Sequence, residues 1–131
     1  MGNPRRSNSS RRNKVLQWLR SQARPCWICG LPIDYDLPSG SPECFECDEL
    51  LPISQGGSPY IRENVGASHR CCNNWRRIKS ISNVQRIRET VYKRYGKPQS
   101  ALDFVYKAKT IEQGYMIPYT GHEPIKNTTN W

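Results

Sequence analysis

Apolar residues recur at helical spacing in three stretches of the chain, residues 10–23, 82–95 and 100–113. An interval of three or four residues places such side chains on one face of a helix, where they can pack against a core. The sequence therefore predicts three helices. Their apolar faces are Val15, Trp18, Leu19 and Ala23 in the first, Val84, Ile87, Val91 and Tyr95 in the second, and Leu102, Val105, Ala108 and Ile111 in the third.

The ends of these helices carry their own signals. Ser10 can cap the first helix, because a serine side chain accepts a hydrogen bond from a backbone amide one turn further on. Arg24-Pro25 ends this helix, since the residue before a proline avoids the helical conformation. Gly96 ends the second helix. Residues 1–9 are basic and polar without periodicity, so we expect a disordered arm there.

Between the first and second helices the chain is rich in Pro, Gly and Ser, and it contains one strand-like stretch at residues 44–53. A turn is expected at residues 55–57, and residues 69–79 are expected to form a short helix. A chain of 131 residues has room for one domain. We predict an α+β fold with its domain at residues 10–79, followed by a helical extension and an irregular tail over residues 80–131.

Charge is distributed unevenly along the chain, which carries 20 Lys and Arg against 11 Asp and Glu, a net charge of +9. Residues 1–33 hold seven basic side chains and no acid, seven of the acids lie between Asp34 and Glu63, and residues 70–79 are basic again. This balance favours a polyanionic partner, nucleic acid first. An acidic cluster between basic flanks suits a site where carboxylates hold a metal ion and cations hold phosphates. An acidic loop that pairs with its own basic flanks would have the same composition.

The compartment follows from what the chain lacks. No apolar run approaches the ~18 residues of a membrane span, and no hydrophobic stretch follows the N-terminal charges. Six cysteines without a secretory signal favour a metal site over disulfides. We therefore expect an intracellular protein with no membrane partner.

The segment Cys26-Trp27-Ile28-Cys29 has the spacing of a metal knuckle, in which two thiolates bind one tetrahedral zinc ion. Such a pair is half of a zinc site, and spacing alone leaves two candidates for the other half. Cys44 and Cys47 would complete a four-cysteine zinc ribbon. His69 and Cys72 have the same spacing at the start of the predicted short helix.

The residues around these candidates form a longer pattern. DELLPISQGG at residues 48–57 is followed by Asn64 and by His69-x-x-Cys72-Asn73. This combination resembles the HNH endonuclease family, and CWICGLPID at residues 26–34 is similar to the opening of phage-type members. The resemblance covers residues 25–79. It implies a small ββα-metal fold stapled by structural zinc, to which the flanking helices are added.

The resemblance also implies which residues bind the metal ions. The structural zinc ligands would be Cys26, Cys29, His69 and Cys72, which leaves Cys44, Cys47 and Cys71 as packing or free thiols. The catalytic Mg²⁺ or Mn²⁺, which prefers oxygen ligands, would be held by Asp48 and Asn73.

Phosphodiester hydrolysis needs a nucleophilic water, a base that deprotonates it and positive charge at the phosphate oxygens. By resemblance, the catalytic residues would be Asp48, Glu49, Asn64 and Asn73, with Asn64 bracing the loop rather than touching the ion. The DNA-binding residues expected on the basic flanks are Arg11, Arg12, Arg70, Arg76, Arg77 and Lys79.

The sequence departs from the family pattern at Glu49, where the family has the histidine that acts as general base. A glutamate, with an ordinary pKa of ~4.3 against ~6.5 for histidine, is a weaker base near neutral pH. Three interpretations stay open: Glu49 deprotonates the water, it joins Asp48 as a metal ligand, or the chain binds DNA without cutting it.

The resemblance thus implies a metal-dependent DNA endonuclease or nickase of a bacteriophage, acting in the cytoplasm of a bacterial host. Its partners would be DNA and, for a packaging role, a phage terminase; homing is the other role it implies. A second hypothesis is a catalytically inactive, zinc-stabilised DNA-binding accessory protein. A third is a plain zinc ribbon that binds its metal through Cys44 and Cys47 and serves as an interaction module.

Overall fold

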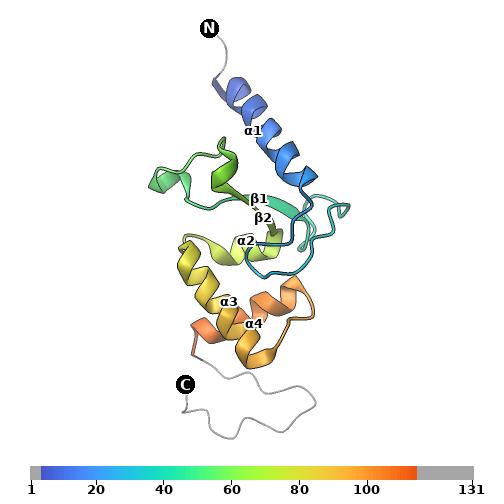
Figure 1. The fold of residues 1–131 in the computed structure, drawn as a ribbon, viewed down its shortest axis with the longest axis vertical. Helices are drawn as coiled ribbons and strands as arrows, with labels where there is room; N and C mark the ends of the chain where they lie inside the picture. The colour runs from blue at the N-terminus through green and yellow to red at the C-terminus, as the bar shows by residue number, and fades with distance from the viewer. Residues whose placement is uncertain (1–3, 115–131) are drawn as a thin grey trace, which may run out of the picture.

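The computed structural model describes residues 4–114, with side chains from residue 9 onward (Figure 1). Four α-helices and a two-stranded antiparallel sheet make this part of the chain α+β, as predicted. The elements in chain order are α1 (Pro4–Ser21), β1 (Phe45–Glu49), the 3-10 turns η1 (Ile53–Gln55) and η2 (Arg62–Asn64), β2 (Val65–His69), α2 (Arg70–Arg76), α3 (Ile81–Tyr95) and α4 (Ala101–Glu112).

The sheet lies between α1 at one end of the molecule and the α3–α4 pair at the other (Figure 1). β1 pairs with β2 so that Cys47 lies opposite Ala67 and Asp48 opposite Gly66. β2 is buried along its whole length, whereas β1 is half-buried at all positions except Asp48. α2 follows β2 directly and contacts both strands. The order strand, strand, helix places the start of α2 beside β1.

Gly66 makes room for an aromatic side chain on the sheet. A Cβ at this position would lie 2.8 Å from Cδ1 of Trp27 and 3.0 Å from Leu50. The backbone amide of Trp27 donates to the carbonyl of Ala67 at 2.9 Å. The segment after α1 is therefore held against β2, and this contact brings Cys26 and Cys29 close to the end of the strand.

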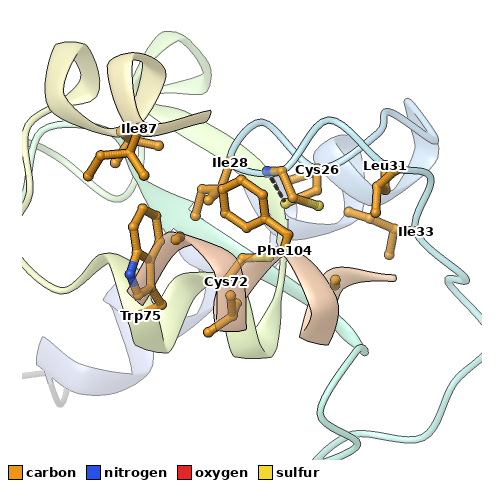
Figure 2. Packing of buried hydrophobic residues seen from close by; sticks show 14 of the residues in the cluster. Cys26, Ile28, Leu31, Ile33, Cys72, Trp75, Ile87 and Phe104 are labelled. Atoms are coloured by element: carbon orange, nitrogen blue, oxygen red, sulfur yellow. Dashed lines mark hydrogen bonds between the residues drawn. The ribbon is translucent and has the colours of Figure 1, made fainter. Parts of the chain in front are cut away.

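The apolar core joins the helices to this sheet (Figure 2). Trp75 of α2 and Phe104 of α4 pack edge to face with their ring centroids 5.6 Å apart, an arrangement that aromatic pairs prefer. Ile28, from the segment after α1, and Phe104 are fully buried. The segment after α1 and the last helix, α4, thus share one core.

The predicted face of α3 is confirmed, because Val84, Ile87 and Val91 are all buried. Ser80 caps this helix by accepting a hydrogen bond from the amide of Asn83 at 3.1 Å. α3 ends at Gly96 and α4 begins after Ser100, where the sequence signals place these boundaries.

The predicted face of α4 is wrong at Leu102, which is 49% exposed. The buried face contains Ala101, Phe104, Val105 and Ala108 instead. Phe104 determines the rotation of the helix, since this buried aromatic side chain packs against Trp75. Leu102 is left on the flank.

The predicted boundaries of α1 are wrong at both ends. The helix begins at Pro4, so residues 4–9 are not the disordered arm that was expected. Proline fits the first helical position, where its missing N–H leaves no bond unmade. The helix ends at Ser21, and Ala23 is exposed with φ at +49°, so it does not belong to the buried face.

The side chain of Asn64 joins the two ends of the segment between β1 and β2, and this junction is called the neck of the segment. Its side chain accepts from the amide of Leu51 at 2.9 Å and donates to the carbonyls of Leu51 and Ser58 at 3.0 Å each. The predicted turn is present, with Gly56 at φ +92°. A Cβ on Gly57 would lie 1.7 Å from the carbonyl oxygen of Leu51, so only glycine fits there.

Helices within residues 4–114 fall short of the length and apolar character that crossing a membrane requires. The predicted irregular tail beyond Gly114 lies outside the described residues.

Candidate metal centre and adjoining carboxylate cleft

Four metal-ligating side chains meet where β2 ends and α2 begins. Cys26 and Cys29 come from the turn after α1, His69 is the last residue of β2, and Cys72 lies in the first turn of α2. Their ligand atoms all lie within 4.8 Å of one another, and all four residues are buried. Three thiols and one imidazole are a donor set that zinc takes in structural sites. The residues therefore fit the structural zinc that the resemblance assigns to them.

The imidazole of His69 is oriented by a backbone carbonyl. Its Nε2 lies 2.9 Å from the oxygen of Pro32, and its Nδ1 lies 3.4 Å from Sγ of Cys29 and 3.9 Å from Sγ of Cys72. A carbonyl oxygen only accepts, so the Nε2 proton points to Pro32 and the Nδ1 lone pair is left for a metal. Such an outer partner is usual for metal-ligating histidines.

The four donors also interact electrostatically. Burial raises the pKa of Cys26, but hydrogen bonds with Cys29, Cys72 and His69 outweigh burial and hold this pKa below its ordinary value. Burial lowers the pKa of His69, while hydrogen bonds with Cys26 and Cys29 overcome that effect and raise it to about 10. The pKa of Cys72 is raised, because its thiol hydrogen-bonds with Cys26, Cys29 and Cys71 and is buried. The four donors thus share protons within one buried cluster, and a divalent cation that binds there must displace them, because metal ligation needs deprotonated thiols and a neutral imidazole.

The fold separates this cluster from the alternative ligand pair. Cys44 lies just before β1, and Cys47 lies within it. Neither is in the group of converging donors. Burial and the carboxylate of Glu49 raise the pKa of Cys47 to about 11, which keeps its thiol protonated. Among the described residues, the cluster pairs the knuckle with His69 and Cys72.

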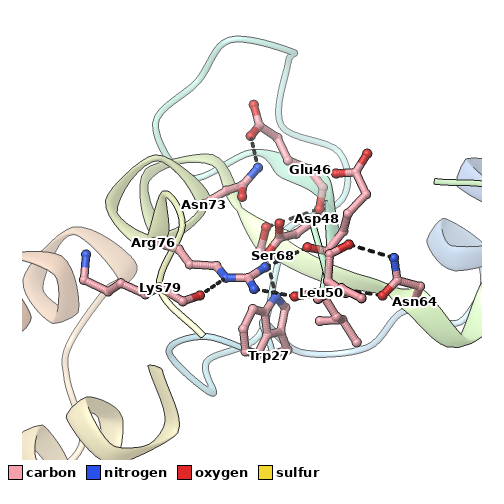
Figure 3. Close-up of polar contacts among 11 residues, drawn as sticks. Trp27, Glu46, Asp48, Leu50, Asn64, Ser68, Asn73, Arg76 and Lys79 are labelled. Carbon is pink, nitrogen blue, oxygen red and sulfur yellow. Dashed lines mark hydrogen bonds and ion pairs between the residues drawn. The ribbon is translucent and has the colours of Figure 1, made fainter. Parts of the chain in front are cut away.

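Asp48 is buried in an ion pair with an arginine of α2 (Figure 3). Its Oδ2 accepts from Nη1 of Arg76 at 2.8 Å and from Nε1 of Trp27 at 3.0 Å. Burial raises the pKa of Asp48, and the hydrogen bond and charge of Arg76 oppose that effect. Asp48 is 6% exposed. It does not fit the predicted role as ligand of a catalytic ion, because its carboxylate already has a cation.

Arg76 is 1% exposed and has no freedom to contact phosphate. Besides Asp48, its guanidinium donates to the carbonyls of Glu49 at 2.8 Å and Lys79 at 3.0 Å. It also lies 4.8 Å from the ring of Trp27. The prediction that Arg76 binds DNA is therefore wrong. A charged residue in a short basic helix is expected to be exposed, and nothing in the sequence marks Arg76 as buried.

A cleft of about 700 Å³ follows β1 on the side of α1. Glu46 and Glu49 of β1 line it, together with Asn73 of α2 and with Arg12 and Arg20 of α1. Nδ2 of Asn73 donates to Oε1 of Glu46 at 3.0 Å. The cleft therefore combines carboxylate and amide oxygens with guanidinium groups.

Glu46 is the residue of this cleft that the sequence did not single out. Its carboxylate, and not that of Asp48, pairs with the side chain of Asn73 (Figure 3). The strand alternation contained the signal, because Glu46 and Asp48 are two residues apart and share a face. On α2, Asn73 and Arg76 are three residues apart and also share a face.

The other predicted DNA-binding residues differ in how exposed their side chains are. Nζ of Lys79 pairs with Glu112 at 3.1 Å and donates to the carbonyl of Trp75 at 2.8 Å, so Lys79 is engaged within the fold. Arg70 is half-buried. The side chains of Arg11, Arg12 and Arg77 are exposed and can meet a polyanion.

Comparisons of the chain with protein-family models, with curated proteins and with solved structures found no match.

Proposed function

We propose that the chain is a DNA endonuclease or nickase of the ββα-metal type, stabilised by zinc at Cys26, Cys29, His69 and Cys72. One observation carries this proposal: α2 brings Asn73 to the carboxylate of Glu46 in a cleft that two arginines also line. The resemblance of residues 25–79 to HNH endonucleases supports the same class. A packaging role beside a phage terminase, or a homing role, is part of the proposal through that resemblance.

The proposed reaction places each cleft residue beside the scissile phosphate. Glu49 accepts the proton of the attacking water, whose oxygen bonds to phosphorus as the bond to the leaving sugar oxygen breaks, and that oxygen takes a proton from a solvent water. Arg12 holds the phosphate through charge-assisted hydrogen bonds. Arg20, which donates to the carbonyl of Tyr35 and lies 5.7 Å from the ring centroid of Phe45, adds positive charge to the wall of the cleft. Glu46 and Asn73 offer oxygen ligands to Mg²⁺ or Mn²⁺. When bound, such an ion supplies positive charge at the phosphate oxygens.

A plasmid-nicking assay tests this proposal on the full, zinc-loaded chain across Mg²⁺, Mn²⁺ and Ni²⁺. Glu49→Gln keeps size and hydrogen bonding but removes basicity, so nicking should fall by ~10²–10⁴ while DNA binding survives. The exposed Glu89 of α3 supplies the control, and Glu89→Gln should nick at the wild-type rate.

Metal titration separates the roles of the two carboxylates. Excess Mn²⁺ should rescue part of the rate of Glu46→Gln, a ligand variant, and none of the rate of Glu49→Gln, a base variant. Rescue of Glu49→Gln alone would exchange the two roles. The nuclease proposal would be overturned if the wild-type chain failed to nick DNA with each of the three ions.

A second function is favoured by the pair of Asp48 and Arg76. This buried ion pair neutralises the carboxylate that the resemblance assigns to the catalytic metal, and Glu49 stands where the family has its base. We propose as the alternative a zinc-stabilised protein that binds DNA without cutting it. The distinguishing result is a wild type that binds DNA and does not nick it, together with a Glu49→His variant that does.

A further inference from the structure

α1 is only partly used by the fold. It has 18 residues, a length of ~27 Å, and its buried residues are Val15 and Leu19. Residues 9–14 are exposed, and the N-terminal turns extend beyond the sheet (Figure 1). Among the side chains of α1 that the structure describes, residues 9–14, 17, 20 and 21 are therefore on its exposed surface.

One exposed face of α1 consists of uncharged polar side chains. Ser10, Asn13, Gln17 and Ser21 are all exposed and follow one another at intervals of three and four residues, which places them on one face. This face is opposite Val15 and Leu19. It presents amides and hydroxyls, groups that donate and accept hydrogen bonds without carrying charge.

Basic residues flank this polar face on both sides. By helical spacing, Lys14 lies along one flank and Arg20 along the other, whereas Arg11 and Arg12 lie nearer to the side of Val15 and Leu19. All four are exposed, and the first 33 residues contain no acid. An ordinary solvated helix mixes both signs of charge, whereas the exposed charges of this one are all positive and therefore complementary to phosphates.

Cation–π contacts hold α1 rigidly against the rest of the molecule. The guanidinium of Arg11 lies 4.3 Å from the ring centroid of Tyr60. In the reverse direction, the guanidinium of Arg62 lies 4.8 Å from the ring of Trp18. Tyr60 and Arg62 both come from the segment before β2. These contacts favour the observed orientation of the helix relative to the cleft.

We propose that α1 is a recognition helix that enters the major groove of double-stranded DNA, and that Asn13 and Gln17 read base edges there. The major groove, ~12 Å wide, admits a helix with its side chains, and Asn or Gln forms paired hydrogen bonds with adenine. The basic flanks contact the phosphates on either side. Double-stranded RNA is excluded as the partner, because its deep and narrow major groove does not admit a helix.

This inference deepens the proposed function and rests on it for DNA as the ligand. Arg12, Gln17 and Arg20 line the cleft that contains Glu46 and Glu49. A helix seated in the groove would therefore deliver the neighbouring phosphate backbone to the carboxylates. Base reading by α1 would set where the cleft acts.

Selection from a random duplex library tests the inference with the full, zinc-loaded chain. The wild type should enrich a short motif that contains adenine. The double variant Asn13→Ala/Gln17→Ala should lose at least ~10-fold in preference for that motif over random DNA and keep its affinity for random DNA. Alanine is the best helix former, so circular dichroism should be unchanged. Gln85→Ala/Gln113→Ala, which removes two exposed amides elsewhere, should keep the preference.

Blocking one groove at a time tests the geometry. Duplexes whose cytosines carry glucosyl-hydroxymethyl groups, which fill the major groove, should bind at least ~10-fold more weakly, and distamycin in the minor groove should not compete. The inference is overturned if the wild type enriches no motif, if the double variant keeps its preference, or if the blocked duplex binds equally well. Nicking is scored separately, so a chain that reads the groove but never cuts refutes the nuclease proposal alone.

Discussion

The cluster of three cysteines and one histidine and the carboxylate cleft lie on two sides of the same short segment, yet they are built differently. His69 and Cys72 point into a buried group of four donors, where Pro32 fixes the imidazole. Their neighbour Asn73 instead reaches the half-buried Glu46 in an open cleft. The comparison teaches that one side of the β2–α2 junction supplies stability. The other side is thereby free to keep polar groups that a core would not tolerate.

The sharpest way to break this comparison is to remove a zinc ligand. Structural zinc contributes ~10–16 kcal/mol in small peptides, which exceeds the stability of a typical small domain. Cys72→Ser should therefore lose the metal and unfold, as measured by metal analysis and circular dichroism. Cys44→Ser/Cys47→Ser should keep both zinc and fold. If this double variant loses zinc while His69→Ala retains it, the ligand set is wrong.

A smaller effect separates Asp48 from the other carboxylates of β1. Arg76→Gln leaves Asp48 buried without its cation, which should cost ~3–5 kcal/mol of unfolding free energy in a denaturant titration at saturating zinc. Glu46→Gln and Glu49→Gln, at half-buried positions facing the cleft, should stay within ~0.5 kcal/mol of wild type. Equal losses for all three variants would contradict the division into a stabilising and a functional side.

The smallest expected effect is on the salt dependence of DNA binding. Arg11→Gln/Arg12→Gln/Lys14→Gln removes three exposed cations from α1. The slope of log K against log salt should become shallower by ~0.9 for each phosphate that the variant no longer neutralises. The matched control, Arg86→Gln/Lys93→Gln/Lys97→Gln, removes three exposed cations from α3 and just beyond it. A change of slope in the control instead would move the DNA surface to the other end of the molecule.

Periodicity and spacing predicted the elements better than the partners of single residues. The buried face of α3 followed from its apolar interval, because local spacing determines which residues share a face. The ligands Cys26 and Cys29 followed from the knuckle spacing. Their partners did not, since two pairs have equivalent spacing and only the paired strands place His69, and not Cys47, beside the knuckle.

The carboxylate site could be predicted in location but not in detail. The pattern around residue 48 marked β1 and the start of α2 as the place where polar groups meet. Because Arg76 is buried, its guanidinium pairs with Asp48. Asn73, one turn earlier in α2, pairs with Glu46. Burial depth depends on how α2 rests on the sheet. No local feature of the sequence encodes it.

The neck formed by Asn64 has a consequence for local motion. One side chain bonds to both backbone groups of Leu51 and to the carbonyl of Ser58, and the amide of Leu50 donates to the carbonyl of Asn64 at 2.8 Å. The segment between the strands can therefore open only when these bonds break together. In hydrogen exchange, the amides of Leu50 and Leu51 should exchange through one cooperative opening, slower than those of the exposed turn at residues 53–56.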